Sequence, residues 1–192
     1  MILPRLDDEA LRRLGIAPDR PVASQIGYVV DDIETACRTF GSRFGVDTWY
    51  RPHILKQKLF YLDTPIQRKI DVVVGYAGST QVELVQRDAE RHSLYELVSV
   101  DPNVGPHHFG LFVRSLDAVC LRLAAQGMQP RQHGSLWFGK GQKSRVAYYD
   151  NRNSFGHIVE IIEHRVQGFY IGMPRWYVAL GAITGHVARV RL

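Results

Sequence analysis

Two stretches of the chain share one pattern of apolar and polar positions. Residues 25–30 (QIGYVV) and 108–113 (HFGLFV) are both rich in β-branched and aromatic residues, and they lie 83 positions apart. After each stretch comes a polar pair and then apolar residues at spacings of three and four, which is the periodicity of a helix. Each helical pattern stops near a glycine, Gly45 or Gly127, the residue type that commonly follows a helix end. The pattern therefore predicts one strand–helix unit that occurs twice.

Three short strand-like runs follow each predicted helix, and turn-forming residues separate them. In the first copy they are residues 59–62, 70–74 and 81–85, and in the second they are residues 129–132, 145–149 and 157–162. Runs of this length, bounded by Gly, Asn, Asp and Ser, are typical of strands joined by hairpins. We therefore expect an α+β fold of tandem β-α-β-β-β units, over residues 22–100 and 105–163.

The segments that flank this core are predicted to be extensions. Residues 1–21 contain a short helical pattern over residues 7–14, which Gly15 ends. Residues 164–192 are rich in aromatic side chains: Phe169, Tyr170, Trp176 and Tyr177. Because aromatic surface is costly to leave in water, we expect these four rings to pack on the domain or on a second subunit. We favour the second subunit, and hence a homodimer.

The composition is that of an ordinary globular protein, since 45% of the 192 residues are hydrophobic and 22% are charged. No run approaches the roughly 20 apolar residues that cross a membrane, and the acidic N-terminus does not resemble a signal peptide. We therefore expect a cytoplasmic protein with no membrane partner. The net charge of +5 comes from scattered Lys and Arg residues, which argues against nucleic acid as a partner. Cys37 and Cys120 are too few for a disulfide framework.

Each copy of the unit ends with a glutamate inside an apolar strand, Glu83 in VELV and Glu160 in VEII. A carboxylate in such a place must be paired, protonated or bound to a metal, because burying it alone is expensive. A salt bridge to Arg or Lys is the ordinary explanation. However, both first strands also begin with a potential ligand, Gln25 and His108. Four such positions in a duplicated frame favour one shared metal site.

The motifs QIGYVVDDI, QVELVQ, HHFGLFV and GHIVEI occur in this order over residues 22–163. Together they resemble the vicinal-oxygen-chelate superfamily of glyoxalases, bleomycin resistance proteins and dioxygenases, and within it the methylmalonyl-CoA epimerase and glyoxalase I branch. The resemblance implies a curved eight-stranded mixed sheet around a cleft that holds one divalent metal. The metal ligands that it implies are Gln25, Glu83, His108 and Glu160. His107 would point to the other face of its strand.

These implied ligands narrow the chemistry. One histidine, one amide and two carboxylates differ from the two-histidine, one-carboxylate set of iron oxygenases, so a ring-cleaving dioxygenase fits the sequence less well. The set suits a redox-silent Lewis acid, and zinc, nickel, cobalt, manganese and magnesium all remain open. The resemblance then implies an isomerase, epimerase or lyase that removes a proton next to a carbonyl or thioester. Its small-molecule substrate would be, for example, an anionic acyl thioester or an α-keto compound.

Glu160 is implied as the catalytic base, with Glu83 as its counterpart from the other unit. Asp71, on the strand before Glu83, is a further candidate base, and the alternative for it is a solvated carboxylate at a strand edge. The glycine-punctuated segment 134–145 would either cover the cleft or form a plain exposed hairpin. The competing function is a metal-free small-molecule binding protein of the bleomycin-resistance type, in which the four polar residues line a pocket.

Overall fold

The computed structural model describes residues 24–67, 69–87, 93–96, 105–139, 141–155, 157–190 and 192. The helix predicted over residues 7–14 lies outside these ranges. The strands are β1 (Gln25–Val30), β2 (Tyr50–Pro52), β3 (Lys56–Tyr61), β4 (Thr64–Pro65), β5 (Val72–Ala77), β6 (Thr80–Gln86), β7 (His108–Phe112), β8 (Gln132–Gly139), β9 (Gln142–Asn151), β10 (His157–Val166), β11 (Phe169–Tyr170) and β12 (Val187–Arg189). The helices are α2 (Ile33–Phe44), α3 (Leu116–Ala124), α4 (Arg152–Phe155) and α5 (Arg175–Ile183), with a 3-10 turn η1 (Leu94–Glu96). None of the described helices is long and apolar enough to cross a membrane.

The predicted strand–helix unit occurs twice at the expected offset. β1 and β7 begin 83 residues apart, and so do α2 and α3. Each of these helices begins behind a capping side chain. Asp32 accepts a hydrogen bond from the third residue after it at 2.8 Å, and Ser115 does the same at 3.3 Å. Such caps satisfy amide groups that the first helical turn leaves without partners.

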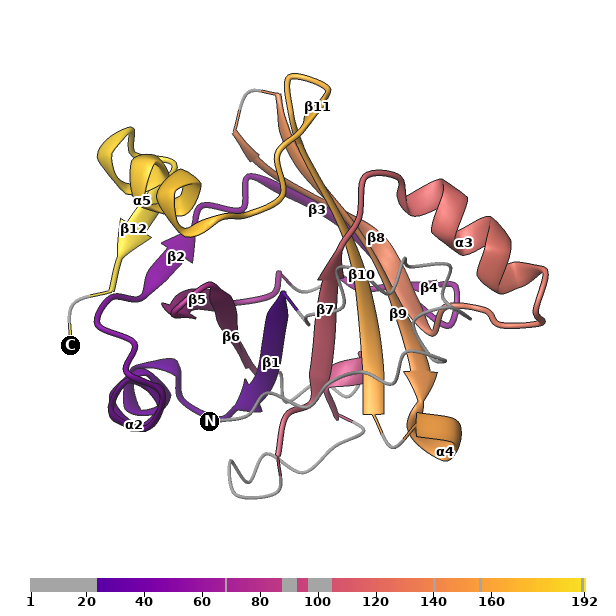
Figure 1. Cartoon of the computed structure of the whole chain (residues 1–192), viewed down its shortest axis with the longest axis horizontal. Helices are drawn as coiled ribbons and strands as arrows, with labels where there is room; N and C mark the ends of the chain where they lie inside the picture. Colours follow the sequence, from indigo (N-terminus) through magenta and orange to yellow (C-terminus); the bar gives the residue numbers. More distant parts are fainter. Residues whose placement is uncertain are drawn as a thin grey trace.

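All described strands belong to one curved sheet, and α2 and α3 lie on its outer side (Figure 1). The strand order is β12-β2-β5-β6-β1-β7-β10-β9-β8-β3-β4, and β11 pairs with β10. The two first strands, β1 and β7, lie antiparallel at the centre of the sheet. Each runs parallel to the last strand of its own unit, β1 to β6 and β7 to β10. The predicted fold class, a curved mixed sheet built from tandem units, is confirmed.

The two halves differ at their outer strands, and the sheet has 12 strands rather than the predicted eight. Residues 59–62, predicted as a strand of the first half, overlap the end of β3, which pairs instead with β8 of the second half. In the first half the place beside β5 is taken by the short β2, and the C-terminal β12 pairs with β2. Exposed sheet edges leave backbone groups unpaired, and the chain covers both edges with these additional strands.

The glycine-punctuated segment 134–145 forms most of the hairpin between β8 and β9, and its buried residues place it in the wall of a cavity rather than in an exposed position. The strand predicted at residues 129–132 begins only at Gln132 and continues to Gly139. This hairpin carries Leu136, Phe138 and Ser144 on the inner face of the curved sheet, where they line a cavity.

Side chains alternate between the two faces along each strand. On the outer face, Tyr28 and Leu84 belong to a core that α2 covers. Ile161 belongs to the matching core under α3. On the inner face, apolar residues such as Val29 and Val85 form a third core inside the curve of the sheet. The inner face therefore offers a buried environment to any polar residue on it.

The C-terminal segment packs on the first half through α5, where Val178 is buried against Tyr50, Val74 and Tyr76. Of the four aromatic rings predicted to be buried, those of Tyr170 and Tyr177 are half-buried on the domain. Phe169 is 74% exposed and Trp176 is 63% exposed. Contact of these two rings with a second subunit stays a prediction.

Candidate metal centre

The four predicted ligands all lie on the inner face of the four central strands. Gln25 starts β1 and His108 starts β7, while Glu83 and Glu160 lie in the middle of β6 and β10. The strand registers of the two halves are equivalent, because Gly27 pairs with Glu83 in the first half and Gly110 pairs with Glu160 in the second. Because successive side chains along a strand point to opposite faces, these registers direct one side chain from each of the four strands towards the same point.

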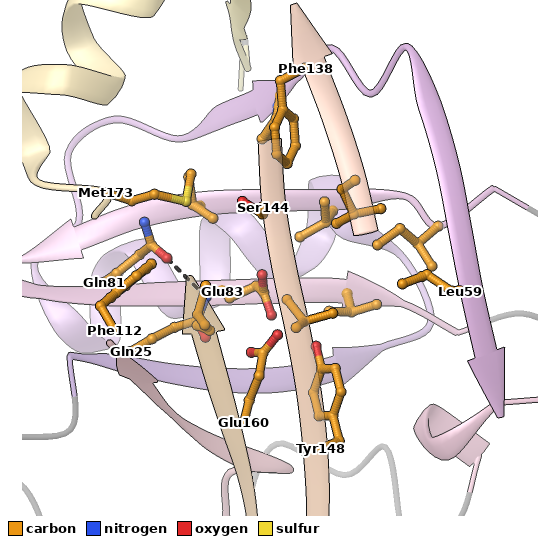
Figure 2. Close-up of a pocket in the computed structure, with 18 of the residues that line it drawn as sticks. Gln25, Leu59, Gln81, Glu83, Phe112, Phe138, Ser144, Tyr148, Glu160 and Met173 are labelled. Carbon is orange, nitrogen blue, oxygen red and sulfur yellow. Dashed lines mark hydrogen bonds between the residues drawn. The ribbon is translucent and has the colours of Figure 1, made fainter. Parts of the chain in front are cut away.

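Three of these side chains converge closely. The Nε2 atom of His108 lies 3.2 Å from Oε2 of Glu83 and 3.2 Å from Oε2 of Glu160. The three ligand atoms all lie within 4.8 Å of one another. Gln25 lines the same cavity as the two glutamates, and Figure 2 shows its side chain beside theirs.

Apart from the ion pairs of His108 with the two glutamates, the ligand atoms have no partner in the described structure. Oε1 of Gln25, Oε2 of Glu83, Nε2 of His108 and Oε2 of Glu160 are all buried without a hydrogen-bond partner. Leaving such atoms unpaired costs about 1–3 kcal/mol each. Two donor atoms bound to one zinc-like ion in tetrahedral or octahedral geometry are about 3.0 to 3.5 Å apart. The spacing and the unpaired atoms therefore both fit a divalent cation held by these residues.

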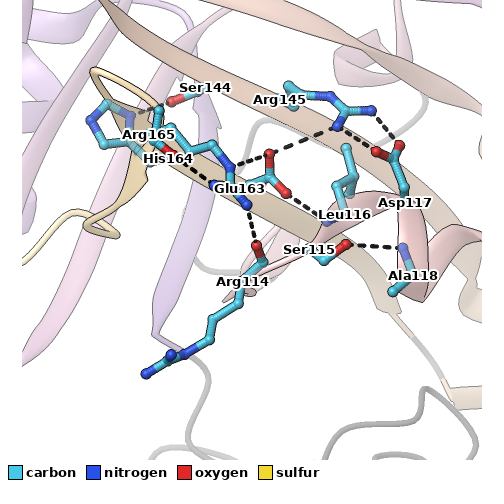
Figure 3. A network of polar contacts seen from close by, with 11 residues as sticks. Arg114, Ser115, Leu116, Asp117, Ala118, Ser144, Arg145, Glu163, His164 and Arg165 are labelled. Atoms are coloured by element: carbon cyan, nitrogen blue, oxygen red, sulfur yellow. Dashed lines mark hydrogen bonds and ion pairs between the residues drawn. The ribbon is translucent and has the colours of Figure 1, made fainter.

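A second buried glutamate on β10 shows what ordinary pairing looks like. Glu163 is 4% exposed, yet one of its oxygens accepts from the N–H of Leu116 at 2.9 Å and the other accepts from Nε of Arg165 at 3.0 Å (Figure 3). Glu160 is 3% exposed and has no arginine or lysine partner among the described residues. Glu163 is thus paired with an arginine in the ordinary way, whereas Glu160 shares one histidine, His108, with the carboxylate of Glu83.

His107 holds the ring of His108 in the orientation that a metal ligand needs. Nε2 of His107 lies 3.2 Å from the carbonyl oxygen of Leu94, and the Nδ1 atoms of the two histidines lie 2.9 Å apart. Since a carbonyl can only accept, Nε2 of His107 carries the proton and its Nδ1 accepts from Nδ1–H of His108. Nε2 of His108 is then the atom that faces the two carboxylates. Metal-bound histidines commonly have such an oriented second nitrogen.

A parallel chain of hydrogen bonds fixes the amide of Gln25. Tyr76 donates its hydroxyl to the carbonyl of Met173 at 2.8 Å and accepts from the amide nitrogen of Gln81 at 2.7 Å. The amide oxygen of Gln81 accepts from Nε2 of Gln25 at 2.9 Å. The remaining polar atom of Gln25 is its oxygen Oε1, a lone-pair donor. Sequence reasoning missed His107, Gln81 and Tyr76 in these roles, although Gln81 is a polar residue paired with Gln25 in the register.

The charges at the centre stabilise a cation. Burial opposes protonation of His108, but the carboxylates of Glu160 and Glu83 outweigh it and raise the pKa of His108 to about 9. Burial raises the pKa of Glu160, and the charge of Glu83 adds to this rise. Burial, together with the charge of His108, lowers the pKa of His107 to about 3, so His107 stays neutral and can accept its hydrogen bond. A divalent cation would relieve the repulsion that the two buried carboxylates exert on each other.

The cluster opens into a cavity of about 50 Å³ on the inner face. Its wall is mostly apolar, with Leu59, Phe112 and Phe138 among the residues drawn in Figure 2. Tyr148 also lines it, and its hydroxyl lies 2.9 Å from that of Tyr95. Apart from the two glutamates, no Asp, Glu, Lys or Arg lines this cavity within the described ranges.

Asp71, the third predicted base, lies away from this centre. It precedes β5, where Val72 and Val74 line the cavity, so the alternation along the chain directs residue 71 to the outer face. Its carboxylate is 47% exposed and lies 3.3 Å from Nε of Arg51. We therefore leave Asp71 out of the proposed site.

Solved structures with a similar chain path include methylmalonyl-CoA epimerase from Mycobacterium tuberculosis, which is 18% identical with a TM-score of 0.46, covering 72% of this chain and 85% of that one. A hypothetical protein from Bacillus halodurans C-125 is 15% identical with a TM-score of 0.47, and the match covers 72% and 91% of the two chains. A Streptomyces coelicolor methylmalonyl-CoA epimerase in complex with 2-nitronate-propionyl-CoA is 13% identical with a TM-score of 0.45, covering 72% and 94%. At such scores these likenesses carry no argument about activity.

No curated protein matched the chain. A family model described as the glyoxalase/bleomycin resistance protein/dioxygenase superfamily matches residues 24–149. The matched range is more than half of the chain and contains both first strands, with Gln25 and His108, as well as Glu83 on β6. The chain therefore belongs to the glyoxalase/bleomycin resistance protein/dioxygenase superfamily.

Proposed function

We propose that the protein is a metal-dependent isomerase, epimerase or lyase that removes a proton next to a carbonyl or thioester of a small-molecule substrate. The observation that carries this proposal is the convergence of Glu83, His108 and Glu160 through buried atoms without hydrogen-bond partners. Gln25 would complete the ligand set. One nitrogen and three oxygens suit zinc, nickel, cobalt, manganese or magnesium rather than an oxygen-activating iron site.

A bound divalent cation would act there as a Lewis acid that acidifies a C–H bond next to a carbonyl group. The proton is accepted by a carboxylate, and Glu160 is the base that we assign, with Glu83 as its counterpart. Both belong to the cluster and also line the cavity, so each reaches the space in which a substrate would lie. They come from strands of different halves, β10 and β6.

The competing function is a metal-free binding protein. In such a protein Glu83 and Glu160 would share one protonated histidine, His108, and Oε1 of Gln25 would stay buried without a hydrogen-bond partner, at a cost of about 1–3 kcal/mol. Elemental analysis separates the two functions. We expect one divalent metal for each chain after expression in metal-supplemented medium, and a metal-free protein under these conditions would favour the binding protein.

Replacing Glu160 with Gln tests the assigned base. Glu160→Gln keeps the size of the side chain and one ligand oxygen, so we expect the fold and much of the metal to remain. Exchange of a substrate's α-proton with solvent deuterium should slow by about 10²-fold or more. The measurement is ¹H NMR in D₂O with a panel of short 2-oxo acids and acyl thioesters.

The same panel with Asp71→Asn tests the remaining sequence prediction. Asp71 lies on the other face of the sheet, so the exchange rate should stay at the parent value. An exchange rate that Glu160→Gln leaves unchanged would exclude Glu160 as the base.

A further inference from the structure

A second cavity, of about 230 Å³, lies between α5 and the inner side of the sheet. Its floor comes from β8, β9 and β10 through Phe138, Gln142 and His164. Its roof comes from the C-terminal segment, including Val178 and Leu180 of α5. The volume is just below the roughly 300 Å³ at which small-molecule sites begin, so the cavity suits one part of a ligand rather than a whole one.

This cavity adjoins the one at the metal centre. Pro52, Phe138 and Met173 line both of them. In Figure 2, Phe138 and Met173 lie at the end of the metal cavity that is away from Tyr148. Ser144 lines the metal cavity, and its hydroxyl lies 2.8 Å from Nδ1 of His164, which lines the second one (Figure 3). The two cavities thus share lining residues and are neighbours on the inner side of the sheet.

The chemistry of the second cavity selects an uncharged group. None of its described lining residues is Lys, Arg, Asp or Glu. Its polar side chains already bond to one another, since His164 Nε2 lies 3.2 Å from the hydroxyl of Tyr177, which donates to Gln142 Oε1 at 3.0 Å. Burial lowers the pKa of His164 to about 4, so this side chain is neutral as well. Thr184 and His186 also line the cavity, and Oγ1 of Thr184 lies 2.8 Å from Nδ1 of His186. The other lining residues are apolar and include Phe138, Met173 and Val178.

We propose that the substrate spans both cavities, with its oxygens at the metal centre and an uncharged, largely apolar tail beneath α5. This inference rests on the proposed function, because the metal centre anchors the reacting end. It assigns the C-terminal segment as a wall that determines substrate specificity. It also narrows the substrate class to compounds whose only charge lies at the reacting end, such as 2-oxo acids with an alkyl or aromatic tail.

The test uses linear alkyl hydroxamates as probes, because their two adjacent oxygens chelate a metal while the chain length varies. Binding of acetohydroxamate through octanohydroxamate to the zinc-loaded protein is measured by calorimetry. We expect about fourfold tighter binding for each methylene group that enters the second cavity. Leu180→Trp should fill the cavity from its rim and abolish this gain, while acetohydroxamate binds as to the parent. Val178→Phe should do the same from inside.

Ile183→Trp is the matched control. Ile183 lies on the same helix and is 78% exposed, but it does not line the cavity, so this variant should keep the full gain with chain length. If acetohydroxamate binds but the longer hydroxamates bind no more tightly, the second subsite is overturned while the metal centre stands. A full gain in both Leu180→Trp and Val178→Phe would also overturn the second subsite. Failure of every hydroxamate to bind would instead overturn the metal centre and this inference with it.

Discussion

Two glycines decide whether the ligands can reach the centre. The antiparallel register of β1 and β7 sets Gly27 opposite His108 and Gly110 opposite Gln25. A Cβ atom at Gly27 would lie 1.9 Å from Cε1 of His108, and one at Gly110 would lie 2.2 Å from Oε1 of Gln25. Both distances are far below contact, so each ligand lies across the bare backbone of the opposite strand. The glycine two residues after each first-strand ligand was visible in the aligned repeats.

Gly27→Ala should therefore impair metal binding. The methyl group would displace the ring of His108, and we expect zinc affinity to fall by about 10-fold or more, the scale seen when ligand orientation is lost. Competition with a chromophoric chelator measures this. Gly78→Ala is the control, because its Cβ would meet nothing within 4 Å, although its φ of +63° makes alanine cost about 1 kcal/mol. Parent-like zinc affinity in Gly27→Ala would show that the ring has room to move.

Strand β10 connects three parts of the protein through side chains that alternate along it. Glu160 faces the metal centre, Glu163 holds the first turn of α3, and His164 faces α5. His164 is 1% exposed and bonds to Ser144 and Tyr177, so docking of α5 depends on a neutral imidazole. Burial keeps it neutral by lowering the pKa of His164 to about 4.

This lowered pKa predicts how stability depends on pH. The unfolded chain binds a proton at His164 with a pKa of about 6.5, whereas the folded chain does not bind it until the pH is near 4. The contribution of neutral His164 to the free energy of unfolding is therefore fully present above about pH 6.5. It is lost as the pH falls towards 4, by about 3 kcal/mol in total. His164→Gln should remove this part of the pH dependence of the free energy of unfolding. Urea unfolding of both proteins between these pH values measures it, and identical pH dependence would contradict the assignment.

At the scale of the whole molecule, the exposed side of α5 is apolar. Trp176, Leu180 and Ile183 are 63%, 49% and 78% exposed, and their spacings of four and three place them along one stripe of the helix. A stripe of this kind marks an interface more often than free surface. Two copies of α5 related by a twofold axis would cover each other's stripe, and the homodimer stays our prediction.

Light scattering tests the homodimer. The parent should have about twice the chain mass of 21.9 kDa, and the double substitution Trp176→Glu and Ile183→Glu should reduce it to the mass of one chain, because a buried charge disfavours association. Leu121→Glu is the control, since Leu121 is 72% exposed on α3, which packs on the outer face of the sheet, whereas α5 lies over the inner side. A parent protein that already has the mass of one chain would show that the stripe is free.

Local patterns were enough to predict the repeat and its ligand-bearing strands. The 83-residue offset, the caps at Asp32 and Ser115 and the mid-strand glutamates are periodic or short-range features, which depend on neighbours in the chain. The period of two also explains why Gln25, Glu83, His108 and Glu160 share one face once their strands are adjacent.

What depended on partners far along the chain came only from the tertiary structure. β3 pairs with β8 of the second half instead of with a strand of its own half, and the C-terminal β12 pairs with β2. An edge strand can pair with any segment that reaches it. The place of Asp71 likewise depended on register, since one residue of register separates the two faces of a sheet. The hydrogen-bond chains from Leu94 to His108 and from Met173 to Gln25 join residues from separate elements. Sequence spacing carries no information on such contacts, because packing of the folded chain alone brings these residues together.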